Sequence, residues 1–68
     1  MQLSARNQIK GIVKEVTNGP VSTEVVIDVN GTEVVSSITT VSATTLNLQK
    51  GDPVVAIIKA SSVLIGKE

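Results

Sequence analysis

The sequence predicts an all-β protein, a five-stranded barrel of the OB type with one short helical turn between the third and fourth strands. Three features carry this prediction. Apolar and polar residues alternate over five short runs, an Asn-Gly pair separates two of these runs, and a segment with the spacing of one helical turn lies between the third and the fourth. Alternation with a period of two is typical of strands, and the β-branched residues that dominate the apolar set favour them. An SH3-like barrel is the alternative.

The first strand is expected over residues 7–17, NQIKGIVKEVT. Apolar residues fall on both of its faces, which indicates a strand with little solvent on either side. Gly11 interrupts the run and predicts a bulge or a bend. A turn is expected at Asn18-Gly19-Pro20, because glycine accepts positive φ and proline cannot continue a central strand. One face of the strand is expected to carry Ile9, Gly11 and Val13, and the other Lys10, Ile12, Lys14 and Val16.

A hairpin is expected next, with strands over residues 21–29 and 32–39. Both runs alternate, and Asn30-Gly31 separates them. A type I′ turn needs positive φ at both central positions, which Asn-Gly accepts most readily. The inward face of the first of these strands is expected to carry Val21, Thr23, Val25, Ile27 and Val29.

The second half of the chain predicts one helical turn and two more strands. Residues 40–48 suit an amphipathic turn of helix capped by Thr40 or Ser42. Residues 53–59, PVVAIIK, begin with proline, which is accepted at the first position of a strand, and a last short strand is expected over residues 63–65. Because the first and fourth strands are apolar on both faces, we expect one outer face to be a subunit interface.

Composition narrows the possible functions. One domain, residues 1–68, is expected, and a core of this size usually needs disulfides, a metal or partner subunits. The absence of Cys and His excludes disulfides, thiolate or imidazole metal sites and a His-activated nucleophile, so we expect an oligomer and no enzyme.

Zero net charge and no aromatic residues argue against nucleic acid as a partner. Without a membrane-length apolar run or a secretory signal, a soluble cytoplasmic protein with no membrane partner is expected.

Three stretches combine hydrogen-bond donors with no acidic residue, namely residues 4–8, 39–42 and 59–62. Arg6 and Lys59 supply positive charge, and hydroxyls, amides and backbone N–H groups surround them in sequence. Such a set is suited to holding a small anion. Each stretch also has a purely structural interpretation: a lysine extending from a strand end, hydroxyls capping the helical turn, and an arginine paired with an acid on the surface.

Four segments of the chain resemble the molbindins, small molybdate- and tungstate-binding proteins built from one Mop/TOBE-type OB module. The segments are SARNQIKG (residues 4–11), STEVVIDVNG (22–31), SSITTVS (36–42) and KGDPVVAIIKASSVLI (50–65). The resemblance implies a non-enzymatic homohexamer, a trimer of dimers. It would bind molybdate or tungstate at its subunit interfaces, for intracellular storage or homeostasis.

The resemblance also implies the residues of the main oxyanion site, which are Ser4, Ala5 and Arg6 from one subunit and Thr39, Ser42, Lys59 and Ala60 from another. Relatives often have serine at the position of Ala60. Only the backbone N–H of Ala60 can donate, so Ser61 is the candidate that replaces the missing hydroxyl. No metal site is implied beyond the oxyanion itself, and a second kind of oxyanion site is implied near the threefold axes.

The residue types give a chemical reason for such a ligand. A tetrahedral dianion is held well by neutral donors plus one or two cations, each charge-assisted hydrogen bond contributing roughly 1.5–3 kcal/mol. Hydrogenphosphate needs an acceptor for its proton, which a site without carboxylates lacks, whereas molybdate, tungstate and sulfate carry no proton at neutral pH. Cavity size must then separate molybdate from sulfate. The other hypothesis is a structural or interaction module of the OB type that assembles without a specific anion.

Overall fold

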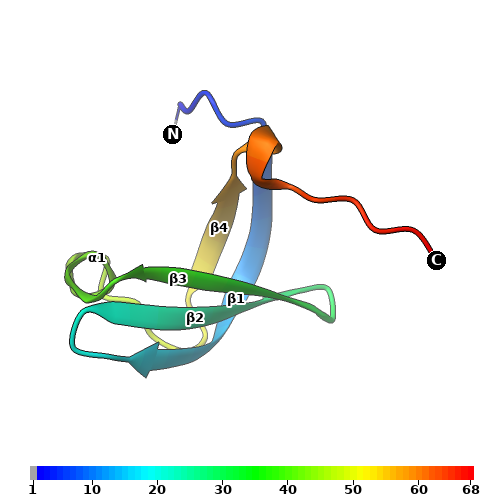
Figure 1. The fold of residues 1–68 in the computed structure, drawn as a ribbon. Coiled ribbons are helices and arrows are strands. Elements are labelled where there is room, and N and C mark those ends of the chain that lie inside the picture. Colours follow the sequence, from blue (N-terminus) through cyan, green and yellow to red (C-terminus); the bar gives the residue numbers. More distant parts are fainter. Residues whose placement is uncertain (1) are drawn as a thin grey trace.

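A four-stranded antiparallel sheet forms the body of residues 2–68, the part of the chain that the computed structural model describes (Figure 1). The strand order is β3-β2-β1-β4. The all-β class and the short helix between the third and fourth strands are thereby confirmed. The elements in chain order are β1 (Asn7–Asn18), β2 (Ser22–Val29), β3 (Thr32–Thr39), the helix α1 (Thr40–Thr45), β4 (Pro53–Ile58) and the 3-10 helix η1 (Ala60–Ser62).

The long strand β1 belongs to both halves of the sheet. Its first half pairs with β4, with Asn7 opposite Ile58, and its second half pairs with β2. Ile12 has a partner on each side, Pro53 in β4 and Asp28 in β2. Figure 1 shows the consequence: the β2–β3 hairpin lies across the direction of β4 rather than alongside it. The sheet is therefore curved in the manner of a partly open barrel.

The bulge in β1 lies at Lys14, so of the two alternatives predicted at Gly11, a bulge or a bend, the bulge was wrong. The pairing register with β2 shifts between Val13 and Glu15. The extra residue reverses the alternation that follows it, which turns Val16 onto the core rather than onto the face of Lys10 and Ile12 where the sequence pattern had placed it.

Gly11 is needed for a close approach of two strands. A Cβ built at this position would lie 2.5 Å from Ile27 Cγ2 and 2.8 Å from the carbonyl oxygen of Asp28. The carbonyl belongs to the β2 backbone and cannot move without disturbing the strand. Glycine is therefore the residue that lets β1 pass under the end of β2.

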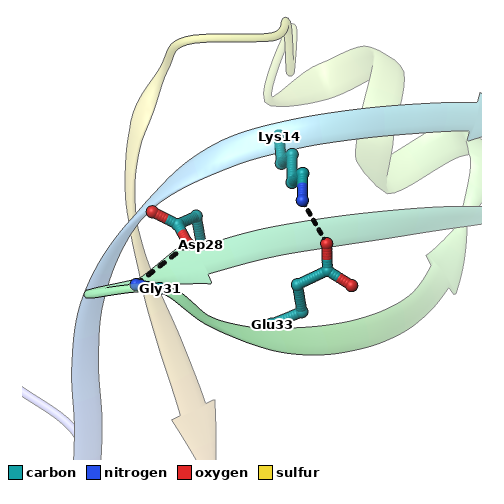
Figure 2. Close-up of polar contacts among 4 residues, drawn as sticks. All are labelled: Lys14, Asp28, Gly31 and Glu33. Carbon is teal, nitrogen blue, oxygen red and sulfur yellow. Dashed lines mark hydrogen bonds and ion pairs between the residues drawn. The ribbon is translucent and has the colours of Figure 1, made fainter.

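The β2–β3 hairpin has the predicted turn. Asn30 and Gly31 have φ values of 50° and 90°, as a type I′ turn requires, and the Gly31 N–H donates to Asp28 Oδ1 at 3.1 Å. Figure 2 shows this bond and the ion pair that Lys14 makes with Glu33 in β3. The hydrogen bond to Glu33 and its negative charge raise the pKa of Lys14 above the usual lysine value, so Lys14 keeps its positive charge at neutral pH and loses it only at a pH above that value. Both side chains are about half exposed, so the pair adds little to stability.

The core lies under the bend of the sheet and is aliphatic throughout. Its buried members are Val13, Val25, Ile27 and Ala56. The expected inward row of β2 is confirmed from Thr23 onward, but Val21 precedes the strand and is 74% exposed. The partly buried side chains packed around this core are Ile9, Val16, Val29, Val34, Ile38, Leu48 and Val54.

The helix α1 is shorter than predicted, and its cap is a different residue. Thr39, in extended conformation, is the N-cap, and its side chain accepts the Ser42 N–H, so the expected capping by Thr40 or Ser42 was wrong. Only Ala43 of the helix is buried. The chain leaves the helix through Asn47 at φ 51°, and neither helix among residues 2–68 is long and apolar enough to cross a membrane.

The expected fifth strand at residues 63–65 is absent. After η1 the chain is extended but belongs to no sheet, and Leu64 and Ile65 are 91% and 90% exposed. Figure 1 shows this C-terminal segment leaving the body of the protein. The barrel formed by the described residues is therefore open between the edges of β3 and β4. The apolar pattern of β1 and β4 predicted strands buried on both faces, but their outer face is partly exposed within one chain. Ile57 in β4 is 45% exposed and Ile12 in β1 is 46% exposed.

Replacing Gly11 with alanine should lower the free energy of unfolding by about 1–3 kcal/mol, because the added methyl group overlaps the β2 backbone. Urea denaturation at a fixed protein concentration measures the effect. Gly66→Ala is the matched control, since a Cβ there meets nothing within 4 Å. Equal stability of the two variants would show that β1 and β2 can separate at this point without cost.

Candidate functional site

Six of the eight predicted site residues lie at one end of the sheet. β1 and β4 are antiparallel with Asn7 opposite Ile58, so the residues before β1 and those after β4 are neighbours. Figure 1 shows the N-terminal segment and η1 close together at this end. We call these residues the strand-end group, and its members are Ser4, Ala5, Arg6, Lys59, Ala60 and Ser61.

The strand-end group presents two exposed cations without acidic partners. Arg6 and Lys59 are both exposed, and the single salt bridge found within residues 2–68 is the Lys14–Glu33 pair, which involves neither of them. The alternative in which Arg6 pairs with Glu24 or Asp28 is therefore not what the structure shows. Two nearby positive charges that lack a counter-ion favour binding of an anion.

The backbone of this group is partly ordered by local hydrogen bonds. Gln8 Nε2 donates to the carbonyl of Ala5 at 3.0 Å, and the Ser62 N–H donates to the carbonyl of Lys59 at 2.9 Å. The second bond closes the 3-10 turn of η1. The N–H groups of Ala60 and Ser61, at the start of that turn, point out of it and have no protein acceptor among the described residues.

The other two predicted residues, Thr39 and Ser42, lie at the start of α1. The Ser42 N–H donates to Thr39 Oγ1 at 3.1 Å, and the Thr39 hydroxyl donates to Ser42 Oγ at 2.7 Å. The single hydroxyl proton of Thr39 is thus used within the chain, whereas that of Ser42 remains available to a ligand. Of this pair, Ser42 is the better donor and Thr39 holds it in place.

One chain does not bring all the predicted residues together. Figure 1 shows α1 and η1 at separate ends of the molecule, with the sheet between them. The resemblance placed Lys59 and Ala60 with Thr39 and Ser42 of one subunit, but in the structure they lie beside Arg6 of their own chain. Any site that uses both groups must draw on at least two subunits.

One residue near Thr39, Thr23, was missed by the sequence analysis as a contributor to this region. Thr23 on β2 is fully buried, and its hydroxyl lies 2.9 Å from that of Thr40. The signal was present, because Thr23 is the one polar residue in the inward row of β2. It was interpreted only as part of the alternation.

The hollows on the surface are mainly apolar. A groove of about 410 Å³ lies between β3 and β4, where the barrel is open. A shallower hollow of about 460 Å³ lies next to Thr39 and is bordered by Val21 and Val41. Neither includes Arg6 or Lys59, and among residues 2–68 no cluster of three acidic side chains gathers to hold a metal ion.

Comparison with known proteins gives consistent matches along the chain. The model of the TOBE domain family matches residues 3–65. A probable molybdenum-pterin-binding protein from Haemophilus influenzae is 48% identical, with all of both chains covered. The structure of a molybdate binding protein from Sporomusa ovata matches with a TM-score of 0.94 at 40% identity, covering 98% of this chain and 100% of that one. The cytoplasmic molybdate-binding protein ModG, solved with molybdate bound, has a TM-score of 0.84 at 41% identity, covering 88% of this chain and 43% of that one.

Replacing Thr39 with alanine should lower the free energy of unfolding by about 1 kcal/mol, because the Ser42 N–H loses its acceptor. Thr39→Ser keeps the oxygen and should stay close to the original stability, and Ser42→Ala, which keeps its N–H, should also change it little. Urea denaturation at one protein concentration compares the three. A Thr39→Ala variant as stable as the parent would contradict the capping role.

Proposed function

The chain belongs to the TOBE domain family as a molbindin-like, non-catalytic binding protein, and from that membership we propose that it binds molybdate and tungstate as intact oxyanions. We propose further that residues 1–68 form one binding domain and that its role is storage or homeostasis of these anions in the cytoplasm. The observation that carries the proposal is the pair of exposed cations, Arg6 and Lys59, at neighbouring strand ends with no carboxylate partner among residues 2–68.

The electrostatics of the strand-end group favour a dianion over a neutral or cationic ligand. Arg6 and Lys59 extend from neighbouring strand ends, so a dianion held between them would be attracted by two positive charges. Arginine also offers several N–H donors in a planar fork that suits two oxygens of one anion. The free N–H groups of Ala60 and Ser61 and the hydroxyls of Ser4 and Ser61 supply neutral donors for the remaining oxygens.

The absence of acidic side chains from the candidate residues supports selectivity against hydrogenphosphate. That anion carries a proton at neutral pH and is held best where an acceptor receives it. Molybdate, tungstate and sulfate offer only acceptor oxygens. We therefore propose discrimination in two steps, with protonated anions excluded by donor chemistry and sulfate by the size of the cavity.

We propose that the complete site forms between subunits of a homohexamer, a trimer of dimers. The strand-end group of one subunit would meet Thr39 and Ser42 of another, because a single chain keeps the two groups apart. The free hydroxyl proton of Ser42 would then reach the anion. Related proteins that bind molybdate have the same fold, which supports the arrangement without specifying the contacts.

We also propose that assembly completes the five-stranded barrel. The groove between β3 and β4 is apolar, and among the side chains that line it are Val34, Ile38, Leu48, Val54 and Ile58. Residues 63–65 of a second copy are the occupant, because all three are apolar, Leu64 and Ile65 are nearly fully exposed in their own chain, and Val63 is 45% exposed. Val63 is already extended, at φ −95° and ψ 119°, so little ordering is needed for it to pair as a strand.

The second candidate function is a structural module that assembles without an anion. It is favoured by one observation, that the Thr39 hydroxyl already donates its proton and accepts an N–H within the chain and so has its proton paired without a ligand. The two candidates differ in one measurable respect. A ligand that binds only the folded assembly raises its melting temperature, so molybdate should shift the unfolding transition of an anion-binding protein and leave that of a structural module unchanged.

Arg6→Ala and Lys59→Ala should each weaken molybdate binding by about 10- to 100-fold, the equivalent of one lost charge-assisted hydrogen bond. Isothermal titration calorimetry with molybdate, tungstate, sulfate and phosphate measures this. Lys67→Ala, which removes an exposed cation from the C-terminal segment, is the matched control and should bind as the parent does. Parent-like affinity in both the Arg6 and Lys59 variants would overturn the site.

Leu64→Asp and Ile65→Asp should convert the assembly into smaller species, because a charge in the apolar groove is not solvated there. Native mass spectrometry gives the masses, and circular dichroism checks that the sheet is retained. Lys67→Asp adds an acidic residue to the same segment outside the apolar run and should leave the hexamer intact. A hexamer that persists in all three variants would show that residues 63–65 do not join the subunits.

A further inference from the structure

Thr23 is a buried polar side chain in a position that packing alone would give to valine. Thr23 lies on the inward face of β2 with Val25 and Ile27, and it is fully buried. Its hydroxyl makes no favourable contact with the apolar side chains of the core. A buried hydroxyl costs free energy unless it is hydrogen-bonded. Valine has nearly the same shape without that cost, so the hydroxyl of Thr23 calls for another explanation.

The partner of this hydroxyl is the first residue of α1. Thr23 Oγ1 lies 2.9 Å from Thr40 Oγ1, and the Thr40 hydroxyl in turn donates to the carbonyl of Gly19 at 2.7 Å. Because Thr40 gives its only proton to Gly19, the short contact requires Thr23 to be the donor. Asn18 Oδ1, at 3.4 Å, is a more distant acceptor for the same proton.

A backbone bond completes the connection. The Thr40 N–H donates to the carbonyl of Val21 at 2.8 Å. Thr40 is therefore hydrogen-bonded to the segment between β1 and β2 through both its main chain and its side chain. Its hydroxyl is also bonded to the buried hydroxyl of Thr23 on β2. The residues on either side of this anchor are those of the proposed anion site: Thr39 precedes Thr40 directly, and Ser42 follows two residues later.

We propose that Thr23 and Thr40 are positioning residues for the anion site: their hydroxyls fix the first turn of α1 so that Ser42 presents its free O–H to the ligand. This inference rests on the proposed function and deepens it. Neither residue contacts the anion. The pair acts from inside the subunit, and its two hydroxyls set where Thr39 and Ser42 stand relative to the sheet.

The pair allows stability and binding to be separated by a set of valine substitutions. Thr40→Val leaves the Thr23 hydroxyl buried with only the distant Asn18 oxygen, so both the melting temperature and the molybdate affinity should fall. The double variant Thr23→Val/Thr40→Val removes both hydroxyls, so no buried hydroxyl is left without a close acceptor, and the half-buried Gly19 carbonyl loses its donor in the single and the double variant alike. Its melting temperature should return towards that of the parent, while its affinity should remain about tenfold lower, the typical loss when support for a ligand-holding residue is removed.

Two further variants serve as controls. Thr40→Ser keeps the hydroxyl and should bind molybdate as the parent does. Thr44→Val changes an exposed threonine of the same helix and should alter neither quantity. Calorimetry measures affinity and a thermal melt measures stability, with all proteins at one concentration. Affinity that recovers together with the melting temperature in the double variant would overturn the proposal, because the hydroxyls would then have only a structural role.

The outcome remains decisive if the parent protein binds none of the anions. That result would refute the proposed function by itself, and the positioning role would then be decided by amide hydrogen exchange. Faster exchange of the Ser42 N–H in the double variant than in Thr44→Val would show that the hydroxyl pair fixes the turn. Equal exchange in the two variants would refute it.

Discussion

The close crossing of β1 and β2 at Gly11 is the constraint on which the rest of the structure depends. β1 pairs with β4 over its first half and with β2 over its second half. It can pair with both strands only if the end of β2 passes directly over it at Gly11. The bulge at Lys14 then restores the inward direction of Val16. These two local features bend a single sheet around a small aliphatic core, which a flat sheet of this size could not enclose.

The same bend decides where the polar groups lie. It places the residues before β1 beside those after β4, and it leaves α1 at the other end of the sheet. Arg6 and Lys59 therefore lie at one end, and the hydroxyl of Ser42 is presented at the other. In the proposed function each chain supplies only part of the anion site, and its open barrel edge and exposed apolar C-terminal segment are the parts that a second copy would cover. Assembly offers one answer to both, which is why binding and oligomerisation are linked in the proposed function.

The strands and the hairpin turn were largely predictable because alternation and turn chemistry are local properties. Asn30-Gly31 needs no tertiary information to form a type I′ turn, and the inward row of β2 from Thr23 onward follows from period two alone. The errors have a common origin. Two features depend on which strand lies alongside: the position of the bulge, at Lys14 rather than Gly11, and the lack of pairing at residues 63–65. The sequence pattern of one segment does not show which segment it pairs with.

The sequence by itself determined the all-β class, the hairpin, the lack of thiol and imidazole side chains and the identity of the donor-rich segments, because each follows from residue types and their spacing. Only the tertiary structure decided that Lys59 stands with Arg6 and apart from Thr39, that Thr39 is a cap whose proton is already used, and that Thr23 anchors α1 from the core. The physical reason is that a hydrogen bond or an electrostatic pairing depends on distance in space. Strand register and the bend of the sheet, rather than separation along the chain, set that distance.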